Sequence, residues 1–353
     1  MPSAKQQPSR IKLRRLDQGW SQAELARRAG ISRAAVSAVE VNRLVPSVAA
    51  ALSLARALGC TVEELFGRES AELVAVQWAW PPATTPCRYW QGQIGRRILR
   101  YPVEGTAAGE IAHDGVHYAG SVAARAGADP EETLVIACCD PAASLLSTQY
   151  SRMTGYRLLA LNRSSQQALT LLGQGLVHVA GIHLSSSDRG QGNAEAVKEH
   201  LGRGFRLLRV ARWQEGLAVA PGLGVASVSA ALRSKLRWVG REPGSGARQC
   251  LDDLFGGRQV PRRLARDHRG VAEAVRCGWA DAGVCLRLVS EEAGLSFLPV
   301  REEGYDLCFP EAAVSDPRLQ ALIRVLRDAE FRRLLGELPG YDAAEMGEER
   351  EVH

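Results

Sequence analysis

Hydrophobic residues recur at helical spacing in a stretch near the start of the chain. Leu25 and Ala26 lie on one face of the first helix that this spacing predicts. Ser21 and Glu24, three residues apart, are placed to form a capping box at the start of that helix. Gly30 ends the helix, because a left-handed backbone after the last turn costs glycine little.

A second short helix is predicted after the glycine. Ser32 is placed to cap it, and Val36 and Val39 face inward while the residues around them face outward. Two short helices joined by a glycine turn predict a helix-turn-helix, which is a DNA-reading element. Further apolar helices continue the pattern, so a helical module is predicted over residues 10–67, behind a flexible polar arm at residues 1–9.

The pattern changes after this module from helical spacing to alternation. Residues 73–80 alternate in strand-like fashion and are followed by two prolines, and residues 88–90 and 98–103 are further strand-like runs. This stretch is too apolar and aromatic for a free linker. Residues 68–116 are therefore predicted to form a small β-rich connector packed on the domain that follows.

Strands and helices then alternate to the end of the chain. The continuous apolar run at residues 133–138 is typical of a strand buried on both faces of a parallel sheet. Further strands are predicted at residues 156–161 and 177–183, and then as two separate strands at residues 205–211 and 216–220. Polar residues that cap helices follow several strands, at the edge where α/β sheets bind ligands. The pattern predicts a ligand-binding α/β domain.

One loop of this domain favours a bound anion. Gly244, Ser245 and Gly246 follow a predicted strand and open a helix, so backbone N–H groups and the helix dipole face the loop. The glycines allow the backbone to approach a ligand closely. Arg248, one turn further on, adds a positive charge, and we expect no matching acidic neighbour in the same loop.

The start of the chain resembles the Cro/repressor-type (XRE) helix-turn-helix family. The matching motifs, in order, are SQ-x-x-LA, G-I-S, V-S-x-x-E, P-S, A-L-G and E-L-F, over about residues 9–67. Val41-Asn42 stands where the family often carries Asn-Gly. The resemblance implies a double-stranded DNA operator bound by a homodimer, because one such module reads only a few base pairs. The DNA contacts that it implies are Gln22, Ser32, Arg33, Ala34, Ser37, Ala38 and Arg43.

The second part of the chain resembles type 2 periplasmic-binding-protein domains, nearest to those similar to molybdate-binding proteins. The matching motifs are G-S-G-x-R and then A-x-A-V-x-x-G-x-A-D-A-G before a strand. The resemblance implies two lobes with a ligand between them over residues 117–342, followed by a flexible tail at residues 343–353. The predicted fold class is therefore multidomain: an all-α helix-turn-helix module, a small β-rich connector and a two-lobed α/β binding-protein-like domain.

This second resemblance implies a small oxoanion such as molybdate or tungstate, held by hydroxyls and backbone N–H groups in the cleft. The chain departs from the family in two places. Cys138-Cys139-Asp140 stands where the family has a small hydroxyl residue, and Arg287 stands where the molybdate binders have a tyrosine. The ligand-binding residues implied are Asp140, Ser164, Ser165, Ser245, Gly246, Arg248 and Arg287.

The excess positive charge lies in the predicted DNA-reading part. The chain holds 44 Lys and Arg against 39 Asp and Glu, which gives a net charge of +5. Residues 1–67 hold ten and five of these, so the remainder holds 34 of each sign. Phosphate contacts require such an excess, so nucleic-acid binding is expected for the first part alone.

Cysteine and histidine spacing predicts neither a metal site nor a cofactor. The eight cysteines show no C-x-x-C spacing. The pairs His113/His117 and His178/His183 lack cysteine or acidic partners at useful spacing. No signal peptide opens the chain and no apolar run reaches membrane-spanning length, so we expect a cytoplasmic protein with reduced thiols and no membrane partner.

Three functions are compatible with these patterns. The main prediction is a DNA-binding transcriptional regulator whose cleft senses a small ligand, without enzymatic activity. One alternative is an α/β enzyme that uses Cys138 or Cys139 as nucleophile with Asp140 and His183, although adjacent buried cysteines usually only pack. The other is a DNA-binding protein whose C-terminal domain is purely structural.

Overall fold

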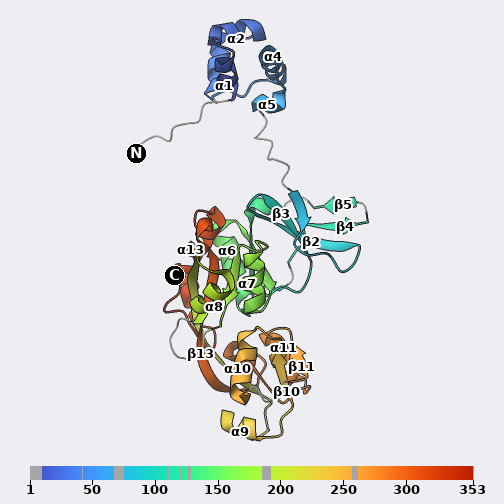
Figure 1. Cartoon of the computed structure of the whole chain (residues 1–353), viewed down its shortest axis with the longest axis vertical. Coiled ribbons are helices and arrows are strands. Elements are labelled where there is room, and N and C mark those ends of the chain that lie inside the picture. Colours follow the sequence, from blue (N-terminus) through green and yellow to red (C-terminus); the bar gives the residue numbers. More distant parts are fainter. Residues whose placement is uncertain are drawn as a thin grey trace. The chain divides into compact units, whose positions relative to one another are not determined.

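The chain folds into two compact units, Met1–Val74 and Ala75–His353 (Figure 1). The predicted arm at residues 1–9 lies outside the described residues. The computed structural model describes residues 10–41, 43–66, 75–109, 111–119, 121–125, 129–184, 192–256 and 261–352.

The first unit is helical, as predicted. Leu25, Val36 and Leu54 are fully buried at the centre of its core. The Ser21 hydroxyl accepts a hydrogen bond from the Glu24 N–H, and Gly30 has a φ of 66°. Its helices are α1 (Arg10–Asp17), α2 (Gln22–Ala29), α3 (Arg33–Glu40), α4 (Val48–Leu58) and α5 (Val62–Phe66).

A buried ion pair connects the first three helices of this unit. Arg15 Nε in α1 lies 2.6 Å from Glu40 Oε1 in α3, and Gln22 Nε2 in α2 donates to Glu40 Oε2 at 2.8 Å. Burial alone would raise the pKa of Glu40, but the hydrogen bonds from Arg15 and Gln22 hold that pKa below its usual value. The pair therefore fixes how α3 packs on α1 and α2.

The β-rich stretch belongs to the second unit and extends beyond its predicted end. The expected boundary after residue 116 falls inside β4, because β4 continues into a hairpin with β5. Arg157 of the α/β part binds Asp114 in an ion pair, and the Tyr101 hydroxyl donates to the Leu176 carbonyl at 2.7 Å. The strands, in the sheet order β1-β3-β2-β4-β5, are β1 (Ala75–Trp78), β3 (Arg97–Pro102), β2 (Cys87–Ile94), β4 (Gly115–Tyr118) and β5 (Ser121–Ala124).

The α/β part is organised around one sheet that runs through both lobes. Its principal order is β11-β10-β12-β9-β13-β8-β6-β7. The strands of the first lobe are β6 (Thr133–Cys138), β7 (Arg157–Asn162) and β8 (Val179–Ile182). Those of the second lobe are β10 (Trp238–Arg241), β11 (Arg263–Ala265) and β12 (Ala282–Leu286).

Two long strands are shared by both lobes. β9 (Phe205–Val219) and β13 (Ser296–Pro310) pair antiparallel along their length, with irregularities between Pro299 and Arg301 and between Tyr305 and Asp306. The prediction of two separate strands in place of β9 is wrong. One end of β9 pairs with β12 of the second lobe, whereas the other end continues beside β13, which pairs with β8 of the first lobe.

Helices cover the sheet in two groups (Figure 1). The first lobe carries α6 (Ala143–Thr154), α7 (Ser165–Gly173), α8 (Gly192–Leu201), α13 (Pro317–Leu326) and α14 (Ala329–Gly336). The second lobe carries α9 (Val228–Arg233), α10 (Gly246–Phe255), α11 (His268–Arg276) and α12 (Arg287–Glu292). Within the described ranges, no helix is long and apolar enough to cross a membrane.

The end of the chain is not the flexible tail that was predicted at residues 343–353. β14 (Tyr341–Asp342) and β15 (Glu349–Glu351) pair with β9. Met346 and Val352 are buried in two different core clusters of the second unit, and this apolar burial stabilises the segment. Residues 343–352 therefore belong to the first lobe.

The buried pair in the helical unit gives the first prediction. Glu40→Gln leaves the Arg15 charge buried without its partner, so it should lower the local unfolding free energy by about 3 kcal/mol. Hydrogen exchange of the α2 and α3 amides in the full chain measures this. The wild-type contribution should also fade as pH falls through the lowered pKa of Glu40, because protonation removes the carboxylate.

Glu24→Gln is the matched control. Glu24 pairs with Arg27 and Arg28 on the helix surface, where the exposed arginines remain solvated when the carboxylate is lost. The account is contradicted if both substitutions change exchange equally, since burial of the Arg15 pair would then carry no extra energy.

Candidate functional site

The recognition helix presents a polar face to solvent. Arg33 and Ala34 are exposed at the start of α3, and Ser37 and Ala38 are half-buried further along it. Ser32 caps the helix by accepting a hydrogen bond from the Ala35 N–H at 3.1 Å. The predicted base-reading positions therefore share one end and one side of α3.

Two further predicted DNA contacts lie beside this helix. Gln22 is the first residue of α2, and its side-chain amide donates to Glu40. That amide is therefore not free for a phosphate, and only the position of Gln22 at the helix start still fits the predicted contact. Arg43 follows α3 with an exposed side chain.

In the second unit, the two lobes meet through the predicted ligand loops. The Gln166 N–H at the start of α7 donates to the Gly244 carbonyl across the cleft at 3.2 Å. Gly246 lies against His183, where a Cβ would be 2.4 Å from the His183 carbonyl oxygen. The glycine at 246 is thus required for contact between the lobes, rather than only for the approach of a ligand.

The predicted serines are buried at this junction. Ser165 Oγ accepts a hydrogen bond from the His183 N–H at 3.1 Å. Ser245 caps α10 by accepting from the Arg248 N–H, and it donates to the Glu242 carbonyl. Ser164 begins α7, and its buried Oγ has no hydrogen-bond partner of good geometry among the described residues.

Arg248 does not supply the free charge that the sequence suggested. Its Nε lies 2.8 Å from Asp252, one turn further along α10, so a residue outside the loop neutralises the charge. Glu242 in the same loop carries a second carboxylate, which binds Arg241.

Two other predicted ligand residues are engaged elsewhere. Arg287 binds Glu291 and the Gln214 side chain, outside the contact between the loops. Asp140 caps the turn before α6 through the Ala142 N–H and accepts from the Tyr341 hydroxyl at 2.6 Å. Burial raises the pKa of Asp140, although the hydrogen bond from Tyr341 acts in the opposite direction.

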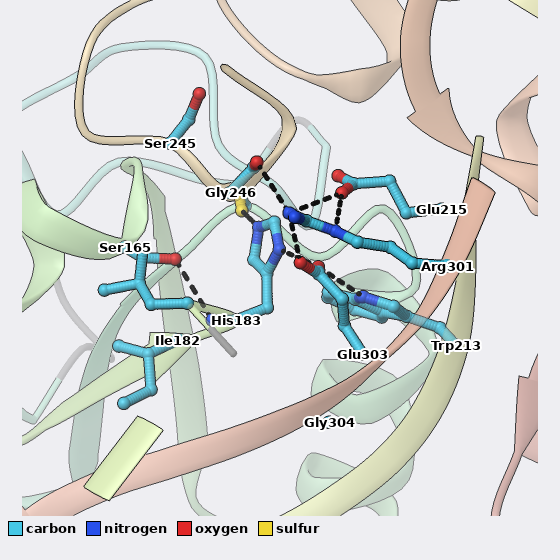
Figure 2. Close-up of polar contacts among 12 residues, drawn as sticks. Ser165, Ile182, His183, Trp213, Glu215, Ser245, Gly246, Arg301, Glu303 and Gly304 are labelled. Atoms are coloured by element: carbon cyan, nitrogen blue, oxygen red, sulfur yellow. Dashed lines mark hydrogen bonds and ion pairs between the residues drawn. The ribbon is translucent and has the colours of Figure 1, made fainter. Parts of the chain in front are cut away.

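A buried arginine balances two carboxylates where the shared strands pass the cleft (Figure 2). Arg301 of β13 pairs with Glu215 of β9 at 3.0 Å and with Glu303, and it donates to the Gly246 carbonyl at 3.1 Å. Burial and the neighbouring Glu303 raise the pKa of Glu215 to about 7. The network connects the strands of both lobes to the first turn of α10.

His183 joins this network to a cysteine. Its Nδ1 lies 2.8 Å from Glu303 Oε2, and its Nε2 lies 3.1 Å from Cys139 Sγ. Burial alone would lower the pKa of His183, but its contacts with Cys139 and Glu303 raise that pKa well above the usual value. The imidazole is therefore held in one orientation in the cleft (Figure 2).

Two more buried groups complete the interior of the cleft. His268, the first residue of α11, has its ring centroid 5.4 Å from that of His183, and neither of its ring nitrogens has a partner within the described part of the chain. Burial, Arg241 and His183 lower its pKa well below the usual value, so the ring is neutral. Arg241 is 1% exposed; Glu242 binds its Nε and Nη2, but no described residue accepts from its Nη1.

An open pocket of about 500 Å³ lies at the edge of the cleft. Glu104 bridges two arginines there, at 2.7 Å from Arg163 and 3.4 Å from Arg266. The pocket is therefore lined by a carboxylate and two guanidinium groups that are already paired with one another. Its lining is Glu104, Asn162, Arg163, Ser164, Gln167, Glu242, Leu264, Ala265 and Arg266.

Sequence reasoning missed most of the charged interior. Arg241, His268, Arg301, Glu215 and Glu303 were not assigned to the site. A signal was present for two of them, since Arg241 ends a short strand and Glu215 directly precedes an apolar run, where an ionisable residue requires a partner. The partners themselves come from distant segments and show no local pattern.

Comparison with known proteins agrees with this architecture. A helix-turn-helix family model matches residues 11–65, and a PBP superfamily domain model matches residues 147–327, which is more than half of the chain. Protein YvgK of Bacillus subtilis (strain 168) is 27% identical over 229 residues, covering 62% of this chain and 74% of YvgK. A protein from the 5′ region of the ferredoxin 2Fe-2S gene of Clostridium pasteurianum is 32% identical over 85 residues, covering 23% of this chain and 72% of its own.

Solved structures show a more distant likeness. A putative phosphate transporter substrate-binding protein from Clostridium perfringens, solved with phosphate, is 10% identical with a TM-score of 0.49, over 60% of this chain and 99% of that one. PhnD1 from Prochlorococcus marinus (MIT 9301), solved with methylphosphonate, is 13% identical with a TM-score of 0.43, over 61% and 93%.

A DNA-binding helix-turn-helix module fused to a two-lobed ligand-binding domain defines the class of this protein. The chain belongs to the PBP superfamily through its second unit. Both resemblances seen in the sequence, to helix-turn-helix modules and to periplasmic-binding-protein domains, are confirmed.

The position of Arg33 gives the second prediction. The side chain is the only long donor among the predicted residues of α3 itself, and it suits the paired acceptors of a guanine. Arg33→Ala should remove about 1–3 kcal/mol of discrimination at one base pair of the operator. Competition binding with operators altered one base pair at a time measures this.

Arg33→Lys is the control, because it keeps the charge and loses the paired donors. It should retain binding to random DNA and lose the same discrimination. If Arg33→Ala instead weakens binding equally on all sequences, Arg33 contacts phosphate alone.

Proposed function

We propose that the protein is a one-component transcriptional regulator whose cleft senses a small oxoanion, with molybdate and tungstate as the first candidates. The helix-turn-helix binds a two-fold operator as a homodimer, because one module reads only a few base pairs. Binding to chromosomal DNA places this function in the cytoplasm. The two family matches support DNA binding joined to a ligand-binding domain, and the oxoanion and the dimer are added by this proposal.

The unpaired Nη1 of the buried Arg241 is the main support for the anion proposal. Arg241 is a buried cation at the carboxyl end of β10, and its Nη1 lacks an acceptor among the described residues. A buried donor without a partner costs about 1–3 kcal/mol. An anion that accepts from Nη1 would offset this cost.

Helix starts from both lobes add to the favourable potential. α7 begins beside Ser164 and α10 begins beside Ser245, and the two starts are joined by the hydrogen bond from Gln166 to Gly244. The unpaired N–H groups and dipoles of helix starts favour anions. The hydroxyl of Ser164 takes part in the capping box of α7, and its own O–H has no acceptor among the described residues, so it is a further donor.

Contact with both lobes explains how an anion would act as a signal. A ligand that binds residues of both lobes has higher affinity for the closed form than for the open form. It therefore shifts the population toward closure. Closure would change the operator affinity of the attached helix-turn-helix module.

A second function is favoured by one contact, the 3.1 Å separation of Cys139 Sγ and His183 Nε2, which is the geometry of a thiol nucleophile and its base. We propose that this pair is not catalytic. Both side chains are buried at the junction of the lobes, where no substrate reaches the sulfur without their separation. Ready alkylation of Cys139 in the full chain would support the enzyme instead.

The third prediction tests the anion site by calorimetry on the full chain with molybdate, tungstate, sulfate and phosphate. At least one anion should bind, and Arg241→Gln should weaken it about tenfold or more, since a hydrogen bond to a charged group contributes about 1.5–3 kcal/mol. Arg248→Gln is the matched control from the same loop, and it should bind as the parent does because Arg248 is paired with Asp252.

Two results would contradict the proposal. The first is the absence of binding by all four anions, which would favour a neutral organic effector or a structural domain. The second is an Arg241→Gln variant that is folded and binds as tightly as the parent.

A further inference from the structure

Three side chains with metal-binding atoms converge in the cleft. Cys139 follows β6, His183 follows β8 and His268 begins α11. Their sulfur and nitrogen atoms all lie within 4.8 Å of one another, and all three residues are buried. The chain thus brings one thiol and two imidazoles to a single point from segments far apart in the sequence.

The second observation is that His268 lacks partners. The side chain is 0% exposed, yet neither ring nitrogen has a hydrogen-bond partner in the described ranges. Buried polar groups are nearly always paired, so such a residue requires an explanation. A metal ion bound to one of its nitrogens would supply the missing interaction.

His183 has the environment of a metal ligand that is oriented from behind. Glu303 Oε2 lies 2.8 Å from Nδ1, and Nε2 on the opposite side of the ring faces Cys139 Sγ at 3.1 Å. Metal-binding histidines commonly contact a carboxylate through the nitrogen that does not bind the ion, which fixes the ring and its tautomer. Glu303 is itself fixed by Arg301.

A second group of His183, Glu215 and Glu303 also lies close together, but it has a cation already. The Arg301 guanidinium pairs with both carboxylates. No described guanidinium forms an ion pair or hydrogen bond with the group that contains Cys139, so that group is the one open to a metal ion.

The donor set selects the class of ion. Thiolate and imidazole ligands favour Zn²⁺ or Cu(I) over Mg²⁺ and Ca²⁺, which require oxygen ligands. Three protein ligands leave one position of a tetrahedral Zn²⁺ site for water or a small anion.

We propose that Cys139, His183 and His268 form a binding site for a thiophilic metal ion, with Zn²⁺ as its divalent representative. Cys139 and His183 come from the first lobe and His268 from the second, so the ion binds both lobes at once. The cleft would then respond to metal availability in addition to any anion. This site does not depend on the anion proposal, because Arg241 provides none of its ligands.

The test uses the full chain without a histidine tag, treated with chelator and titrated with Zn²⁺ against a coloured competing chelator. One Zn²⁺ should bind per chain. Cys139→Ser and His268→Gln should each weaken binding at least about 100-fold, since each removes a ligand. Co²⁺ in place of Zn²⁺ should show thiolate-to-cobalt charge-transfer absorption that Cys139→Ser abolishes.

Cys138→Ser and His178→Gln are the matched controls, because both residues are largely buried in the same lobe outside the cluster. They should bind Zn²⁺ as the parent does. The proposal is overturned if the parent binds no Zn²⁺, or if Cys139→Ser and His268→Gln remain folded and bind it unchanged. Anion calorimetry on the chelator-treated chain shows separately whether the proposed function fails.

Discussion

The second unit depends on one buried guanidinium. Glu215 and Glu303 lie on the neighbouring strands β9 and β13, and without Arg301 their carboxylates would face each other in the interior. Removing one partner of a buried ion network is strongly destabilising, because the remaining charges lose their compensation. The same guanidinium donates to the Gly246 carbonyl in the first turn of α10. One side chain therefore both balances the charges of the shared strands and holds α10 in place.

The contact of the two lobes around the Arg301 network determines which side chains meet in the cleft. Glu303 orients His183, and Gly246 allows the second lobe to lie directly on that histidine. The contact also buries polar atoms that no described residue satisfies, on Arg241 and His268. Such atoms make an empty closed cleft costly, which is the property that a ligand-dependent hinge requires.

The sequence predicted what is local and failed where the partner is distant. The caps at Ser21 and Ser32 and the glycine turn at Gly30 were found because each depends on adjacent residues. β9 was divided into two strands, because its continuity comes from pairing with β13 about ninety residues later. Arg248 was predicted as the anion-binding arginine, in place of Arg241, because of its position in the first turn of the helix. Which arginine has a free donor depends instead on the carboxylates that bind them, Asp252 for Arg248 and Glu242 for Arg241.

Hydrogen exchange at the Gln166 amide tests the central claim, that the Arg301 network holds the lobes together. This N–H lies in the first turn of α7 and bonds only across the cleft, to Gly244, whereas the Ala168 N–H bonds within its own helix. Arg301→Lys keeps the charge and loses the fork that reaches Gly246. It should speed exchange at Gln166 about tenfold and leave Ala168 unchanged. Unchanged exchange at Gln166, or an equal increase at both amides, would contradict the account.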